Sequence, residues 1–328
     1  MKKTKRFMKR FFLFLLILAA FMYINNSSIL TKASENTPLL LAHRGLAQTF
    51  PMKGIEGDTC TAERIYEPEH PYLENTISSM EAAFNKGADV VELDIQPTKD
   101  GDLAIFHDWT LECRTNGKGV TRDHTMEELK QLDIGYGYTA DNGETYPFRE
   151  KGTGLMPTLE EVLQTFPEGA FLIHIKSNDP NEGRLLAQYL SKLPKKQLAQ
   201  LTVYGGDEPV KELMNDLPTL RAMSKSTLKS CLISYETFGW TGYVPASCKH
   251  TQLHIPEKYA SIIWGWPNKF IQRMDKVDTR VILVAGDGGW SEGFDTEDDV
   301  KRLPANYSGG IWTNRIDRIA PILKNKRD

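Results

Sequence analysis

The sequence of 328 residues lacks the marks of several protein classes. It has four cysteines and no Cys-x2-Cys spacing, which argues against a zinc site built from cysteine pairs. A formal net charge of -3 leaves no basic excess for binding nucleic acid. Repeats, low-complexity tracts and a second domain are also missing. With 40% hydrophobic and 25% charged residues, the composition predicts one globular domain behind a targeting segment.

Residues 1–33 have the composition of a signal peptide or of an N-terminal membrane anchor. Six of the first ten residues are basic, and the apolar run 11–24 that follows has 14 residues, less than the ~20 that span a bilayer. Ala33 offers a small residue for cleavage. Both interpretations leave the basic end inside and place the domain formed by 34–328 outside the cytoplasm, either secreted or attached to the membrane.

The even number of cysteines is compatible with disulfides in an oxidising compartment. Four cysteines allow three complete pairings. If the chain forms a barrel, Cys60 and Cys113 lie in the loops after its first and third strands, and the simplest hypothesis then joins Cys60 to Cys113 and Cys231 to Cys248; four unpaired buried thiols are the alternative.

Several apolar segments end in imidazole or charged side chains, as buried parallel strands do at the functional edge of a sheet. The run 39–42 is followed by His43 and Arg44, and 103–106 by His107. In 90–96 the side chains alternate, so Glu92 and Asp94 share the face opposite the apolar residues. Burying charged and imidazole side chains in a core is unfavourable, and we therefore expect a functional site where these strands end.

Strand and helix patterns alternate along the chain. A capped helix is expected near 76–86 and another at 158–166, and the polar loops 51–71 and 133–154 are expected on the substrate side. Besides the run that begins at Leu39, the predicted strands are 90–96, 103–107, 171–176, 201–204, 220–223, 281–285 and 310–313.

The order of short motifs resembles that of glycerophosphodiester phosphodiesterases. The resemblance is densest between residues 39 and 176, and its motifs are His43-Arg44-Gly45, Glu74-Asn75-Thr76, Glu92-Leu93-Asp94, Asp100-Gly101, His107-Asp108, Arg114-Thr115 and the segment from Pro157 to Leu163. It implies a single catalytic domain of the α/β class, a (β/α)8 TIM barrel, and metal-assisted hydrolysis of phosphodiesters.

Hydrolysis of a phosphodiester requires proton transfer and neutralisation of the phosphate charge. His43 and His107 are the expected acid and base, in an order that the sequence leaves open, because histidine takes both protonation states near neutral pH. Arg44 is expected to bind phosphate oxygens in a bidentate manner, and Lys176 to add a point charge. Trp312 is the expected aromatic wall of the substrate pocket.

Glu92 and Asp94 on one strand face indicate a divalent metal, with Mg2+ or Ca2+ favoured by hard oxygen ligands. Where the family has Glu-x-Lys, this chain has His174-Ile175-Lys176. The imidazole removes a hard ligand, so Zn2+ or Mn2+ also fits, and His174 is either a ligand, a contact to phosphate or a bystander. Glu74 is a second candidate ligand, with orientation of His43 or of a glycerol hydroxyl, and capping of the next helix, as alternatives.

The expected function is hydrolysis of a glycerophosphodiester, or of a related lysophospholipid diester, to an alcohol and glycerol phosphate. The alternatives are a phosphodiesterase that forms a cyclic phosphate and a barrel that binds glycerol phosphates with weakened turnover. The expected partner is thus a small or lipid-derived phosphodiester and no nucleic acid, with membrane attachment through the N-terminus where that segment is not cleaved.

Overall fold

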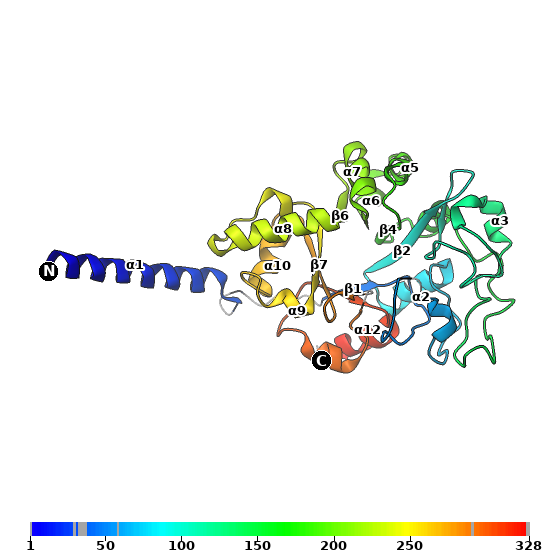
Figure 1. Ribbon diagram of the computed structural model, residues 1–328, viewed down its shortest axis with the longest axis horizontal. Helices are drawn as coiled ribbons and strands as arrows, with labels where there is room; N and C mark the ends of the chain where they lie inside the picture. Colours follow the sequence, from blue (N-terminus) through cyan, green and yellow to red (C-terminus); the bar gives the residue numbers. More distant parts are fainter. Residues whose placement is uncertain (1, 29–30, 32–37, 58, 290–291, 326–328) are drawn as a thin grey trace.

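The computed structural model describes residues 2–28, 31, 38–57, 59–289 and 292–325 (Figure 1). Its strands are β1 Leu39–Ala42, β2 Val90–Pro97, β3 Leu103–Ile105, β4 Phe171–Ile175, β5 Leu201–Gly205, β6 Arg221–Ser224, β7 Gln252–Pro256, β8 Arg280–Val284 and β9 Gly310–Thr313. Its helices are α1 Lys2–Asn26, α2 Ile77–Lys86, α3 Met126–Lys130, α4 Leu159–Thr165, α5 Pro180–Leu190, α6 Lys195–Leu198, α7 Asp207–Asp216, α8 Lys225–Phe238, α9 Glu257–Ala260, α10 Asn268–Asp275, α11 Glu297–Arg302 and α12 Ile316–Asn325, with short 3-10 turns η2 Thr61–Arg64, η3 Thr121–Asp123, η4 Gly239–Thr241 and η5 Ala246–Cys248.

The strands form a nearly closed parallel (β/α)8 barrel, as the sequence predicts. Around the barrel the order is β6-β5-β4-β2-β1-β9-β8-β7. Between β6 and β7 the hydroxyl of Thr251 donates to the carbonyl of Ala222 at 2.6 Å, which bridges the remaining gap. Apolar side chains of the outward strand faces pack against the helices and form the main core.

Two strand predictions require correction. The segment 103–107 is not a barrel strand, because β3 pairs antiparallel with β2 outside the barrel, with Ile105 opposite Ile95. The tight turn at 98–101 already demands this, since a parallel pair needs a long crossover. The eighth barrel strand is instead β7, which the sequence prediction missed because Gln252 and His254 interrupt its apolar pattern.

Local signals place the helices as predicted. Thr76 caps α2 through a reciprocal pair of hydrogen bonds with Ser79, and Gly87 ends the helix with φ 106°. Thr158 and Glu161 form the same capping box at the start of α4. These caps fix where each helix begins, and therefore where the loops carrying the site begin.

Both predicted disulfides are present. Cys60 is bonded to Cys113, and Cys231 to Cys248. The first joins the loop after β1 to the loop after β3, over a small hydrophobic cluster that fills the space beneath the long loops.

Helix α1 projects away from the barrel (Figure 1). Its stretch Thr4–Asn26 is long and apolar enough to cross a membrane by length and composition. The described helix thus extends past the apolar run 11–24 of the sequence prediction and reaches the ~20 residues that a span needs.

Candidate active site

Polar side chains gather at the carboxyl ends of β1, β2, β4 and β9. His43 and Arg44 follow β1 directly, Glu92 and Asp94 lie in β2, and His174 lies in β4. The parallel register places Asp94 beside His174 across the β2–β4 pair. Parallel strands bring their carboxyl ends to the same end of a barrel, which is where the sites of such folds form.

Glu92, Asp94 and His174 form a compact group whose ligand atoms lie within 4.8 Å of one another. His174 Nδ1 lies 2.9 Å from Asp94 Oδ1 and 3.9 Å from Glu92 Oε1. Both carboxylates are buried, with 0% and 1% of their surface exposed. Two carboxylates and an imidazole in this arrangement are a donor set that fits a divalent cation.

The two carboxylates are electrostatically unequal. Burial and the neighbouring Asp94 raise the pKa of Glu92 to about 8. Burial also opposes ionisation of Asp94, but Lys176 and Arg44 outweigh it and hold the pKa of Asp94 well below its usual range. Lys176 Nζ lies 3.5 Å from Asp94 Oδ1. Two buried carboxylates side by side repel each other, and a positive charge between them would favour ionisation of both.

Arg44 lies between two carboxylates of the site, those of Asp94 and Glu74. Its Nε lies 3.2 Å from Asp94 Oδ2, and its Nη1 donates to Glu74 Oε1 at 3.0 Å. The residue has φ 56°, and Gly45 follows with φ 81°. A Cβ at Gly45 would lie 2.8 Å from the backbone carbonyl carbon of Ser79, so only glycine fits this turn.

Glu74 is held between two arginines. Besides Arg44, Arg114 approaches with Nε 3.2 Å from Oε1 and Nη2 3.3 Å from Oε2. Burial opposes ionisation of Glu74, but Arg114 and Arg44 outweigh it and lower its pKa. Its carboxylate lies outside the Glu92–Asp94–His174 group, and Thr76 rather than Glu74 caps α2.

His43 has a defined orientation. Its Nδ1 lies 2.6 Å from Asn314 Oδ1, and the Asn314 amide donates to Asp295 Oδ2 at 2.8 Å, so the hydrogen-bond pattern assigns the Nδ1 proton to His43. Its Nε2 faces the site, 3.8 Å from Glu92 Oε2. Burial, followed by the charge of Arg44, holds the pKa of His43 well below 6.5. His43 is therefore neutral at neutral pH.

His107 is supported by a carboxylate instead. Its Nδ1 lies 2.6 Å from Asp108 Oδ1, and Arg114 binds the other oxygen of Asp108. Burial, followed by the charge of Arg44, lowers the pKa of His107 below its usual value, although Asp94 and the hydrogen bond to Asp108 oppose this shift. Gln96, on the same strand face as Glu92, donates to the backbone carbonyl of Asp108 at 3.2 Å and so fixes the loop that carries this histidine.

Comparison with known proteins places this arrangement in a family. The model of the glycerophosphoryl diester phosphodiesterase family matches residues 43–205, the segment that supplies His43, Arg44, Glu92, Asp94 and His107. The chain belongs to this family. It is 37% identical to a glycerophosphodiester phosphodiesterase of Bacillus subtilis (strain 168) over 179 residues, which are 50% of this chain and 58% of that protein. The chain spans about half the length of the curated relatives it matches.

Solved structures share the fold at low identity. The glycerophosphoryl diester phosphodiesterase domain of protein Rv2277c from Mycobacterium tuberculosis aligns with a TM-score of 0.63 at 16% identity, covering 89% of this chain and 100% of that one. An Oleispira antarctica phosphodiesterase in complex with its product sn-glycerol-3-phosphate aligns with a TM-score of 0.56 at 18% identity, covering 88% and 97%. These likenesses support the barrel fold.

His174 in β4 stands where the family pattern has a glutamate, and its contacts differ from those of a carboxylate. The ring of His174 stacks on Tyr204 with centroids 4.1 Å apart and an interplanar angle of 11°. The hydroxyl of Tyr204 donates to Glu92 Oε1 at 2.7 Å. Burial lowers the pKa of His174 to about 4, against the hydrogen bond to Asp94. A neutral imidazole is the form that binds metals.

Several residues of the candidate site escaped the sequence prediction. Asn75 exchanges two hydrogen bonds with Asp94, one to its carboxylate and one from its backbone N–H. Tyr204 lies in β5 and Asp295 in the loop after β8, far from the other residues in sequence. The alternation in β2 could have indicated Gln96, and the Glu-Asn-Thr motif could have indicated Asn75. Tyr204 and Asp295 carried no local signal.

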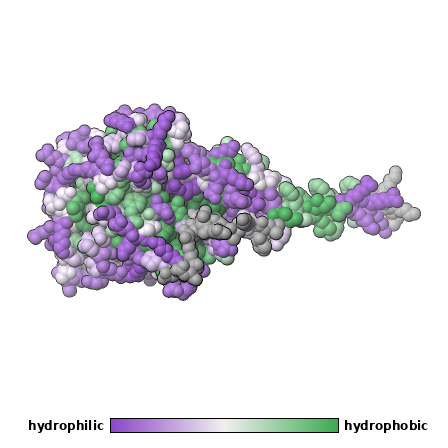
Figure 2. All heavy atoms as spheres, turned by 180° about the vertical axis from the view of Figure 1, so that it is seen from behind, coloured by the Kyte–Doolittle hydropathy of each residue, from purple (hydrophilic) through white to green (hydrophobic). Residues whose placement is uncertain are grey.

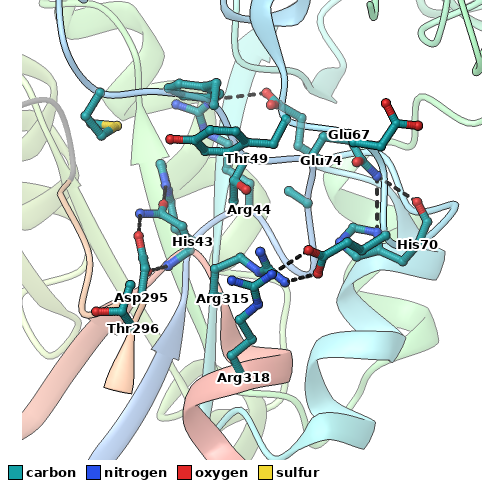
Figure 3. Close-up of a pocket in the computed structure, with 17 residues that line it drawn as sticks. His43, Arg44, Thr49, Glu67, His70, Glu74, Asp295, Thr296, Arg315 and Arg318 are labelled. Atoms are coloured by element: carbon teal, nitrogen blue, oxygen red, sulfur yellow. Dashed lines mark hydrogen bonds and ion pairs between the residues drawn. The ribbon is translucent and has the colours of Figure 1, made fainter. Parts of the chain in front are cut away.

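Two cavities open on the site and share His43, Arg44 and Phe50. The first, of about 560 Å³, is lined in part by Phe50 and Tyr66. Arg315 and Arg318 also line it (Figure 3), and both pair with Glu69. The second, of about 570 Å³, contains His107, Asp108, His174, Lys176 and Tyr204. Trp312 packs against His43, with ring centroids 4.8 Å apart, and is 3% exposed; its contact with substrate stays a prediction.

Proposed function

We propose that the chain hydrolyses glycerophosphodiesters to an alcohol and glycerol phosphate. The observation that carries the proposal is that His43 and His107 line the same cavity as Arg44, Lys176 and His174, each histidine with its Nδ1 held by an oxygen acceptor. The Oleispira antarctica phosphodiesterase binds sn-glycerol-3-phosphate as its product, and the family membership extends this chemistry to the present chain.

Glu92, Asp94 and His174 are the residues that would hold a divalent cation. Their donor atoms are close enough to share one ion, and the raised pKa of Glu92 reflects two adjacent buried carboxylates. A bound cation would supply Lewis acidity toward the phosphate oxygens. Mg2+ or Ca2+ suits the carboxylates, whereas His174 favours Zn2+ or Mn2+.

The two histidines would divide proton transfer. His43 presents a neutral Nε2, suited to accept the proton of the attacking water. His107 would donate a proton to the leaving alkoxide as the bond between phosphorus and oxygen breaks. Its hydrogen bond to Asp108 opposes the lowering of its pKa by burial, and so favours the protonated form that this step needs. Arg44 and Lys176 would hold the phosphate, and Glu74 would position Arg44 rather than bind metal.

The two cavities would take the two substituents of the diester. The phosphate would lie beside Arg44, which lines both cavities, and one substituent would extend into each.

The test is hydrolysis of a panel of phosphodiesters by the purified chain, with and without chelator. His43→Ala and His107→Ala should each lower kcat by about 10^2 to 10^4 with the fold retained by circular dichroism. The matched control is His250→Ala, because His250 also bonds a carboxylate through Nδ1, that of Asp278 at 2.5 Å, but lies just before β7, at the other end of the barrel.

More than a tenth of the activity in either variant removes that histidine from the mechanism. Accumulation of a cyclic phosphate shows that a substrate hydroxyl, rather than water, attacks. Binding of glycerol phosphates without any turnover indicates the weakened barrel instead.

The N-terminal segment and the disulfides support a location outside the cytoplasm. We propose that α1 inserts into the membrane with its basic start inside, which places the barrel on the outer side. Two disulfides agree with an oxidising compartment.

A further inference from the structure

The carboxyl end of α1 contacts the barrel through a buried arginine. Arg273, in α10, is 6% exposed and donates to the backbone carbonyl of Asn25 at 2.8 Å and to the Asn26 side chain at 2.9 Å. It also donates to the hydroxyl of Tyr235 and to the carbonyl of Gly239 at the end of α8. The guanidinium thus meets the carboxyl ends of two helices, where unpaired carbonyls favour a cation.

Neighbouring backbone groups complete this contact. The side-chain amides of Asn25 and Asn26 both donate to the carbonyl of Trp240, at 3.0 and 2.9 Å. Ser28 donates to the carbonyl of Gly265 at 3.1 Å and accepts from the N–H of Asn268. We call residues 25, 26 and 28 with Arg273 the anchor seat. Cleavage near Ala33 would remove three of its four residues, and with them the backbone carbonyl that accepts from Nη2 of Arg273, whereas Nη1 would keep Tyr235 and Gly239.

The anchor seat lies at the end of the barrel opposite the active site. Ser224 ends β6 at the catalytic end and also caps α8. From there α8 runs back for 14 residues, about 21 Å, to η4, which contacts α1. In Figure 1, α1 accordingly leaves from the side of α8 and α10, whereas α3 and the long loops lie at the far side.

The body of α1 is long enough to enter a bilayer, and the seat brings the barrel close to it. The stretch Thr4–Asn26 has 23 residues, about 35 Å of helix, of which the uninterrupted apolar run 11–24 spans about 21 Å. Basic residues precede this run and would lie at the lipid head groups. Figure 2 shows it as a green apolar segment between the hydrophilic tip and the body of the protein.

Exposed apolar side chains surround the seat. Phe238 and Tyr243 are 53% and 57% exposed, with ring centroids 6.5 Å apart, and they flank η4. Ile262, 70% exposed, lies three residues before Gly265. Aromatic residues favour the membrane–water interface, so a bilayer that receives α1 would also cover these side chains.

We propose that α1 is retained as a membrane anchor. The anchor seat then orients the barrel so that the end opposite the active site faces the membrane and the active site faces away from the bilayer. The consequence for specificity rests on the proposed function: the enzyme takes phosphodiesters from the aqueous phase, such as deacylated head-group diesters, in preference to lysophospholipids embedded in its own membrane.

The orientation is tested with the full chain reconstituted in phosphatidylcholine–phosphatidylglycerol vesicles that contain a lipid with a spin-labelled head group. A fluorophore is attached to a single new cysteine, either Lys276→Cys beside the seat or Glu67→Cys at the rim of the first cavity. We expect quenching to be several-fold stronger at position 276 than at position 67. Equal quenching, or stronger quenching at 67, overturns the proposal.

A second comparison tests the seat itself. Asn25→Ala combined with Asn26→Ala should reduce the difference in quenching between the two positions, whereas Asn215→Ala on the exposed part of α7 should leave it unchanged. An unchanged difference in the double variant shows that the seat does not set the orientation. A mature protein that lacks residues 1–33 by mass spectrometry refutes retention of the anchor.

The specificity is measured on the same vesicles. A short-chain lysophosphatidylcholine that stays dissolved should be cleaved several-fold faster than a long-chain one held in the bilayer. Equal rates contradict the proposed specificity. Absence of cleavage of every diester contradicts the proposed function but leaves the quenching result standing.

Discussion

Replacing Glu74 by glutamine tests whether this residue positions Arg44 or binds a metal ion. Glu74→Gln keeps the size of the side chain but removes the charge between Arg114, which is buried, and Arg44, whose side chain is 11% exposed. Breaking a buried ion pair costs about 3–5 kcal/mol, and we expect the lower end, about 3 kcal/mol, because each arginine keeps another carboxylate. Arg44 retains Asp94, and Arg114 retains Asp108.

The chain offers a matched control in Glu69. This carboxylate also pairs with two arginines, Arg315 and Arg318, but its side chain is 52% exposed. Exposed pairs contribute about 0–1 kcal/mol, so Glu69→Gln should barely shift the midpoint of urea unfolding. Glu74→Gln should shift it clearly to lower urea.

Function and metal binding are measured on the same two variants. We expect Glu74→Gln to lower kcat, because Arg44 loses the group that orients it, and to leave the affinity for metal, measured by titration calorimetry, within a few-fold of the original. Equal urea midpoints for the two variants would refute the electrostatic reasoning. Loss of metal affinity with unchanged stability would instead make Glu74 a ligand.

Three further predictions concern pH, the disulfide and the metal. Burial and Arg44 hold the pKa of His43 below 6.5, and a base must be neutral, so kcat/KM should stay level as the pH falls through 6.5 and decline only below it; an acid limb centred at or above 6.5 contradicts this. Replacing Cys60 and Cys113 by serine removes a disulfide between positions 53 residues apart and should lower the free energy of unfolding by about 4 kcal/mol, measured by urea unfolding against the intact protein; an unchanged midpoint contradicts this value. His174→Glu should raise the affinity for Mg2+ or Ca2+ relative to Zn2+ or Mn2+ in metal titrations, and unchanged selectivity would place His174 outside the ligand set.

Much of the site could be predicted because its signals are local. Alternation along β2 places Glu92 and Asp94 on one face whatever the strand packs against. The apolar run 39–42, followed by His43 and Arg44, likewise predicted both a strand and the functional residues at its carboxyl end. The capping residues Thr76 and Thr158 placed two helices for the same reason, since a cap is made within four residues.

The strand assignments failed where the outcome depended on distant partners. The segment 103–107 has the composition of a barrel strand, but its tight connection to β2 forces an antiparallel pair outside the barrel. Gln252 and His254 weaken the apolar pattern of β7, which is recognisable as a strand only through its pairing with β8. Composition alone does not distinguish a strand in the barrel from one beside it.

The sequence by itself determined the type of fold, the acidic pair of β2 and the two histidines at strand ends, because each depends on short-range periodicity or on motifs of a few residues. Only the tertiary structure decided which side chains form hydrogen bonds with these residues. Asn314 meets His43 because β9 lies beside β1, and Tyr204 reaches Glu92 from β5 across β4. Such contacts join residues more than a hundred positions apart, so they exist only once the barrel has closed.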